Sequence, residues 1–163
     1  MLSGRFEIKK KIMDEIIEEV VNEQLHAEIW SSNLCLVFQL YFFEQKLPML
    51  SSWLDVQIQK KSLRIRKLAE FLILGKANVV IREQVCRAEE WQSPMMALNA
   101  LLAHEQYFHQ QVVDFLNWVH HANNPSLQEL ASDLYADEMH LGDFILELLR
   151  ILTKEWRRRL PFE

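Results

Sequence analysis

Apolar residues recur at steps of three and four along most of this chain, the spacing that places them on one face of an α-helix. In one such segment the repeat runs through Leu98, Leu101, Glu105, Phe108, Val112, Phe115 and Val119. We therefore predict four long helices, over about residues 7–43, 48–74, 94–121 and 125–156.

The ends of these helices carry ordinary start and stop signals. Pro48 stands in a first-turn position, where its missing N–H costs nothing, and Gly75 follows the last residue of the second helix. Ser93 and Asn124 precede prolines and are expected to cap the third and fourth helices. The segment formed by residues 76–92 is too long for a hairpin turn. We therefore expect two helical hairpins, with this segment as the long crossover between them. The prediction is an all-α four-helix bundle, with residues 1–163 as a single domain.

Composition narrows the classes of function. The 163 residues carry a net charge of −5, which argues against a nucleic-acid partner. Cys35 and Cys86 have no metal-ligand spacing and form no disulfide framework, so a reducing cytoplasm is the expected location. No apolar run reaches about 18 residues, and no membrane partner is expected.

Charged residues interrupt three of the four apolar faces: Glu28, Lys61 and Glu105, with Arg64 one turn beyond Lys61. Glu28 and Lys61 lie at nearly equal sequence distances from the first turn, so their heights along the bundle differ by only about 3 Å. Glu105 and Met139 are likewise level about the second turn. The sequence predicts a polar layer in mid-core, to which Asp137 or Glu138 also belongs.

Such a layer admits two interpretations. A pair of hard cations needs several carboxylates and usually histidines from Glu-x-x-His helices. Here Glu28 and Glu105 are balanced by Lys61 and Arg64, and the formal sum of zero attracts no dication. The charges favour a buried ion-pair network over a metal site at this level.

A relocated metal site is the alternative. "EQLH" (Glu23 to His26) and "DEMH" (Asp137 to His140) have the spacing of ligand pairs, but both histidines are offset from the apolar faces. Candidate ligands for this alternative are Glu23, His26, Glu105, His109, Asp137 and His140. We expect His104, His109, His120 and His121 to be surface or subunit-contact residues.

Four segments together resemble bacterial-type ferritins. "NEQLHAEIWSSNLCL" resembles the first-helix pattern N-E-Q-x-x-x-E-x-[YW]-S-S, and "WLDVQIQKKSLRIRKLAEFL" resembles the second helix, where the family has W-x-x-x-Q-x-x-E-E-x-x-H. "WQSPMMALNALLAHEQ" and "YADEMHLGDFILELL" resemble the third and fourth helices. The likeness covers residues 8–152 and implies a ferritin-like bundle.

The resemblance implies a damaged iron centre. Ferritins bind two ferrous ions through carboxylates and one histidine, oxidise them, and store the mineral inside a shell of 24 subunits. Glu28 and Glu105 match ligand positions, whereas Lys60 and Lys61 occupy the usual glutamate pair and Arg64 the histidine.

Further departures follow in the fourth helix and near the centre. Met139 stands where glutamine is common, Leu141 and Gly142 where acidic residues are expected, and Cys35 where a tyrosine is usual. These replacements are similar to those in the light subunits of animal ferritins, which do not oxidise iron. The resemblance therefore implies no catalytic residue and no ferroxidase activity. The second helix has no mid-helix methionine to bind haem, and because Pro161 ends any helix, we expect the family's fifth helix to be absent.

The expected function is a structural or mineral-supporting subunit of an iron-storage shell. Iron is expected only as weakly bound ion or mineral, with no tightly bound cofactor. The expected partners are copies of the chain, as a shell or a dimer, and active ferritin subunits. The alternatives are a metal enzyme with a relocated site and a dimeric scaffold that forms no shell.

Overall fold

The computed structural model describes residues 13–87, 89–138 and 140–159. Over these ranges the chain is helical or irregular, with no strand. The helices are α1 (Glu15–Glu44), α2 (Pro48–Leu74), α3 (Pro94–His120), α4 (Pro125–Asp137) and α5 (Leu141–Arg159). The predicted all-α bundle is confirmed, and α2 and α3 follow their predicted bounds closely.

Helix α1 begins later than the apolar pattern predicts. The side chain of Asp14 accepts a hydrogen bond from the backbone N–H of Ile16 at 2.8 Å and caps the helix there. The remainder of the predicted start, residues 7–12, lies outside the described residues. Ser93 and Asn124 cap α3 and α4 through their side chains, as expected.

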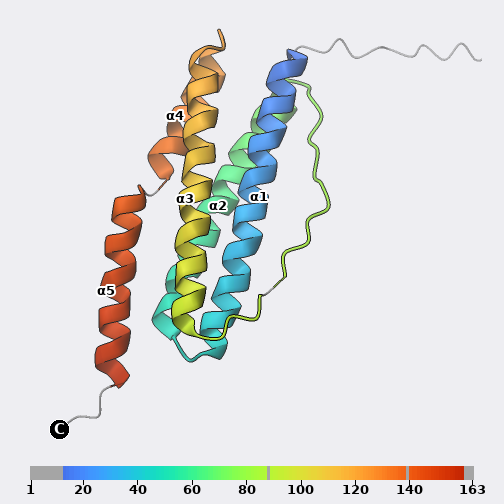
Figure 1. Ribbon diagram of the computed structural model, residues 1–163. Helices are drawn as coiled ribbons and strands as arrows, with labels where there is room; N and C mark the ends of the chain where they lie inside the picture. Colours follow the sequence, from blue (N-terminus) through green and yellow to red (C-terminus); the bar gives the residue numbers. More distant parts are fainter. Residues whose placement is uncertain (1–12, 88, 139, 160–163) are drawn as a thin grey trace, which may run out of the picture.

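The crossover between α2 and α3 runs along the outer side of α1 (Figure 1). Asn22 on α1 fixes it twice: its Nδ2 donates to the carbonyl of Asn78 at 2.9 Å, and its Oδ1 accepts from the N–H of Val80 at 2.8 Å. Farther along, Trp91 stacks on Phe38, with ring centroids 4.7 Å apart. Side chains of α1 therefore hold this irregular segment against the bundle.

The predicted single helix over residues 125–156 is wrong, because the structure divides it into α4 and α5. The break comes at Glu138, whose backbone is extended (ψ 128°) and whose side chain is buried. Both helices pack against α2 and α3, so together they fill the fourth position of the bundle, with α5 at its edge (Figure 1). Helix α5 is not an additional helix after the predicted fourth one; within the described residues, it is the second half of that predicted helix. The residues around Pro161 lie outside them.

The end of α5 is docked on the turn between α1 and α2. The buried carboxylate of Glu155 accepts a hydrogen bond from the N–H of Met49, in the first turn of α2. Arg159 donates to the carbonyls of Gln45 and Lys46 at 3.0 and 2.9 Å. The basic tail of the chain thus satisfies backbone groups that the helix termini leave unpaired.

The core has two large apolar clusters at opposite ends of the bundle and a small third one around Phe108. One large cluster lies near the α1–α2 turn and includes Phe38, Phe42 and Leu54, while the other includes Leu25 and Leu68. The charged residues of α1, α2 and α3 lie between the two large clusters. None of the described helices combines the length and apolarity that crossing a membrane requires.

Candidate functional site

Arg64 is the centre of the charged layer. Its Nε donates to both carboxylate oxygens of Glu28, at 3.0 and 3.1 Å. Its Nη2 lies 3.0 Å from Oε2 of Glu138, and its Nη1 donates to the carbonyl of Asp137 at 3.3 Å. Only 3% of Arg64 is exposed, so one desolvated guanidinium joins α1, α2 and the end of α4.

This pairing gives the physical reason for the break in the fourth helix. Arg64 binds the last carbonyl of α4 and the carboxylate of the next residue, Glu138. In a continuous helix the Asp137 carbonyl would instead accept a hydrogen bond from a backbone N–H one turn later in the same helix. The guanidinium therefore satisfies the end of α4 from a neighbouring helix.

Lys61 forms the second half of the layer. Its Nζ lies 3.9 Å from Oε1 of Glu105 and 3.7 Å from the ring centroid of Phe108, a cation–π contact. The thiol of Cys35 donates to the same Glu105 oxygen at 3.6 Å. Burial raises the pKa of Glu105, and the nearby Lys61 ammonium opposes that rise.

The structure brings together Glu28, Lys61, Arg64 and Glu105 as predicted. Of the two further candidates, it places the side chain of Glu138 in the layer and that of Asp137 at the surface. Three carboxylates (Glu28, Glu105 and Glu138) face two cations, so the formal charge is −1 rather than the predicted zero. Burial raises the pKa of Glu28, while Arg64 and Lys61 act to lower it. Burial alone would lower the pKa of Arg64, but Glu28 and Glu138 outweigh it and raise that pKa.

The layer does not fit a pair of ferrous ions as substrate. Both oxygens of Glu28 are taken by Arg64, and one oxygen of Glu105 faces Lys61 and Cys35. Two dications would add four positive charges to a layer of formal charge −1, beside two desolvated cations. The side chains already supply the positive charge that these carboxylates need.

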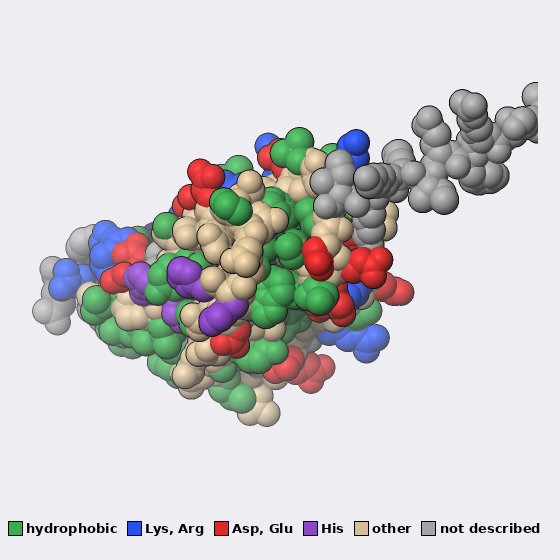
Figure 2. Space-filling view, turned by 90° about the horizontal axis from the view of Figure 1, so that it is seen from above, with side chains coloured by type: hydrophobic (Ala, Val, Ile, Leu, Met, Phe, Trp, Pro, Cys, Tyr) green, Lys and Arg blue, Asp and Glu red, His purple; other side chains and the backbone are tan. Residues whose placement is uncertain are grey.

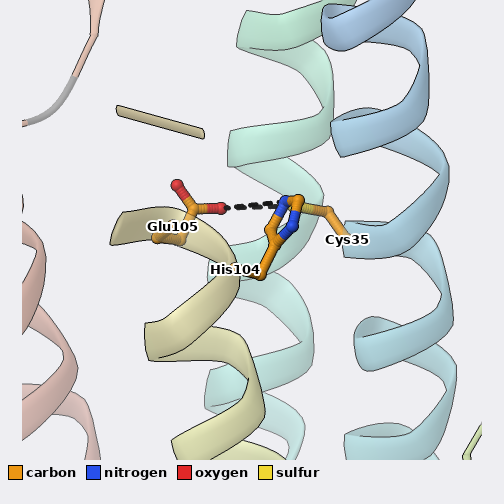
Figure 3. Close-up of side chains that lie close together, drawn as sticks. All are labelled: Cys35, His104 and Glu105. Carbon is orange, nitrogen blue, oxygen red and sulfur yellow. Dashed lines mark hydrogen bonds and ion pairs between the residues drawn. The ribbon is translucent and has the colours of Figure 1, made fainter. Parts of the chain in front are cut away.

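His104 is buried, and its expected surface position is wrong. Its Nε2 lies 2.9 Å from the hydroxyl of Ser31, and its ring meets Trp30 edge-on with centroids 4.8 Å apart. Burial first, and then the Lys61 ammonium, lower the pKa of His104 to about 3. Figure 3 shows it beside Glu105, with Cys35 reaching toward both from α1.

The remaining histidine and carboxylate candidates have other partners. Glu23 pairs with Arg82, and Gln84 donates to the ring Nδ1 of His26 at 2.8 Å, so both α1 residues hold the crossover. Asp137 pairs with Lys67 at the surface, at 3.2 Å.

The other histidines lie at or near the surface. The rings of His109 and His140 lie 6.0 Å apart; His109 is half-buried, whereas His140 is exposed, as are His120 and His121. Figure 2 shows surface histidines gathered on one face. Across the described ranges, the proposed ligands of a relocated site form no group of three.

Two further positions that the resemblance assigns to the iron centre have exposed residues. Gly142 is exposed at the start of α5, with nothing within 4 Å of where a Cβ would stand. Lys60 is also exposed, beside buried Lys61. Met139 lies outside the described residues.

Arg64→Met should lower the free energy of unfolding by about 3–5 kcal/mol, because it leaves two buried carboxylates without their cation. Urea unfolding followed by circular dichroism measures the loss. Exposed Arg66→Met, two residues away, is the matched control and should change stability by less than about 0.5 kcal/mol. Equal effects of the two substitutions would contradict the buried pairing.

His104 should make stability depend on pH. Its pKa is lowered in the folded state, so the unfolded chain binds the proton more readily and stability falls as pH drops from about 6.5 toward 3. His104→Gln removes this contribution, so the stability difference between parent and variant should narrow between pH 7 and pH 4.5. Ser31→Ala keeps the imidazole and should retain the parent's slope. A difference that stays constant with pH would contradict the assignment.

Comparison with known proteins agrees with this architecture. The family model for the ferritin-like domain matches residues 18–154. A bacterial non-heme ferritin of Bacteroides fragilis is 24% identical over 96 residues, and the matched part spans 59% of this chain and 60% of that relative. The matched region is thus about three-fifths of the curated relative's length.

Solved structures share the fold. An open pore ferritin from the hyperthermophilic archaeon Archaeoglobus fulgidus superposes with a TM-score of 0.72 at 22% identity, covering 87% of this chain and 86% of that one. A Chlorobium tepidum ferritin gives a TM-score of 0.72 at 18% identity, covering 90% and 86%. With a family match over most of its length and a bundle of the same architecture, this chain belongs to the ferritin-like domain family.

Proposed function

We propose that this protein is an iron-storage subunit that does not oxidise iron, and that it supports the structure or mineral of a ferritin shell. The observation that carries the proposal is the bond of Arg64 to both oxygens of Glu28 at the centre of the bundle. A guanidinium with two short bonds to one carboxylate occupies the position where the resemblance places an iron ligand.

The energetics support a centre that stays closed to iron. Removing one member of a buried ion pair is costly because the remaining charge is left without solvent or partner. Ferrous ions entering this layer would have to displace both Lys61 and Arg64, which are each 3% exposed. The layer therefore holds the bundle together instead of exchanging both of its cations for a pair of ferrous ions.

An exposed apolar surface supports self-association. Leu40 and Phe43 on α1 are 60% and 71% exposed, and Leu63 on α2 is 57% exposed. Leu40 and Phe43 lie three residues apart on one face of α1, and exposed apolar side chains that form a patch, in contrast to scattered single ones, mark an interface. We assign this surface to contacts with other copies of the chain or with active ferritin subunits, in a reducing cytoplasm that suits its two free cysteines.

The purified protein should consume no oxygen in proportion to added ferrous iron. The double variant Lys61→Glu with Arg64→His should gain measurable ferrous binding and some oxidation, because it restores a carboxylate and an imidazole at the family's positions. Oxygen-electrode and stopped-flow absorbance measurements test both. The pair Lys60→Glu with Arg66→His, which changes exposed neighbours in the same way, is the control. Stoichiometric oxygen consumption by the parent protein would refute the proposal.

Native mass spectrometry should find the parent protein as an oligomer. Leu40→Glu together with Leu63→Glu should shift it toward monomer, because each places a charge on the proposed interface. Ile16→Glu, at an equally exposed position near the start of α1, should leave the assembly unchanged. A discrete dimer would favour the scaffold that forms no shell, and a monomeric parent protein would contradict any assembly through this surface.

A further inference from the structure

One group of metal-ligating side chains belongs neither to the Arg64 pairing nor to the surface. Cys35 on α1 and His104 and Glu105 on α3 offer ligand atoms that all lie within 4.8 Å of one another. The Glu105 oxygen is 3.6 Å from the Cys35 sulfur and 3.9 Å from Nε2 of His104. Figure 3 shows the three side chains converging from the two helices.

We infer that Cys35, His104 and Glu105 bind one thiophilic divalent cation, of which Zn²⁺ is the best fit. The inference does not rest on the proposed function, since a zinc ion undergoes no redox change and leaves the ferroxidase question untouched. It differs from the relocated site expected above, which used Glu23, His26 and the surface histidines.

The distances are close to those of a metal centre. Bond lengths of about 2.3 Å to sulfur and about 2.0 Å to nitrogen or oxygen place tetrahedral ligands about 3.3–3.6 Å apart. The cluster is therefore wider than a closed site by less than about 1.5 Å. Metal binding requires that rotation of these side chains on their two helices closes the remaining gap.

The donor atoms are suited to a metal. His104 is 6% exposed, and its Nδ1 has no hydrogen-bond partner among the described residues. Nε2 lies 2.9 Å from the hydroxyl of Ser31, which can donate to its lone pair, and that lone pair can bind a cation once the Ser31 hydroxyl turns away. Ser31 or a water molecule can complete four ligands. The sulfur selects soft cations over the hard ones that prefer all-oxygen sites.

The charge balance also favours a single cation. Binding replaces the Cys35 thiol proton by the metal, forms an S–metal bond and releases that proton to solvent. A dication with loss of one proton adds a single positive charge, which brings the layer from −1 to zero. Two ferrous ions would make the charge of the layer positive, whereas one thiolate-bound cation brings that charge to zero.

The Lys61 ammonium repels a bound cation and so lowers the affinity of this site for it. Its ammonium lies 3.9 Å from the Glu105 oxygen that would become a ligand, and it must give up this contact when a metal binds. The contact with Phe108 remains available to it. Lys61→Met should therefore strengthen binding by about tenfold or more, the size expected when one nearby like charge is removed from a buried site.

Anaerobic titration of the metal-free protein with Co²⁺ tests the site. We expect one equivalent to give a thiolate-to-cobalt charge-transfer band and the strong visible bands of a tetrahedral ion, both removed by one equivalent of Zn²⁺. Cys35→Ser should abolish the charge-transfer band and weaken binding more than about 100-fold. Cys86→Ser, which removes the other free thiol from the crossover, should change neither.

A second measurement avoids dependence on a folded variant. Zinc-edge X-ray absorption of the zinc-loaded parent protein should show one sulfur ligand and at least two nitrogen or oxygen ligands. Absence of the charge-transfer band, its persistence in Cys35→Ser, or a zinc shell without sulfur would overturn the inference. Oxygen consumption with ferrous iron is a separate readout, so failure here and failure of the proposed function are distinguishable.

Discussion

The bond between Arg64 and Glu28 is the constraint on which the middle of this protein depends. A bundle of this kind could bury an uninterrupted apolar core, but here a charged layer lies between two apolar clusters. Each charge in the layer is desolvated, and each is tolerable only while its partner is in place. The layer thus specifies how α1, α2 and α3 align, because a shift of one helix by one turn would separate the pairs.

The same guanidinium decides the shape of the fourth position of the bundle. By binding Glu138 and the carbonyl of Asp137, Arg64 satisfies the end of α4 at the level of the layer. Helix α5 then begins afresh at Leu141 and docks on the α1–α2 turn through Glu155 and Arg159. The residue that the resemblance places at a metal-ligand position thus also pairs with the backbone where α4 ends.

Much of this arrangement could be predicted from the sequence. The repeat of apolar positions fixes which face of each helix is buried, and a charge within that repeat, such as Lys61, must meet an opposite charge in the core. The break at Glu138 could not be predicted, because it depends on a guanidinium from another helix rather than on local signals such as proline or glycine. The burial of His104 was missed for a related reason: it lies one position from the apolar face, and Trp30 and Ser31 of α1 cover it.

We propose that side-chain cations have taken the place of iron between Glu28 and Glu105. Crystals soaked anaerobically in ferrous salt, with diffraction collected on both sides of the iron absorption edge, test this directly. We expect no anomalous peak within bonding distance of Glu28, with Arg64 still paired to both of its oxygens. An iron peak bound to Glu28, with Lys61 and Arg64 turned away from the layer, would contradict it.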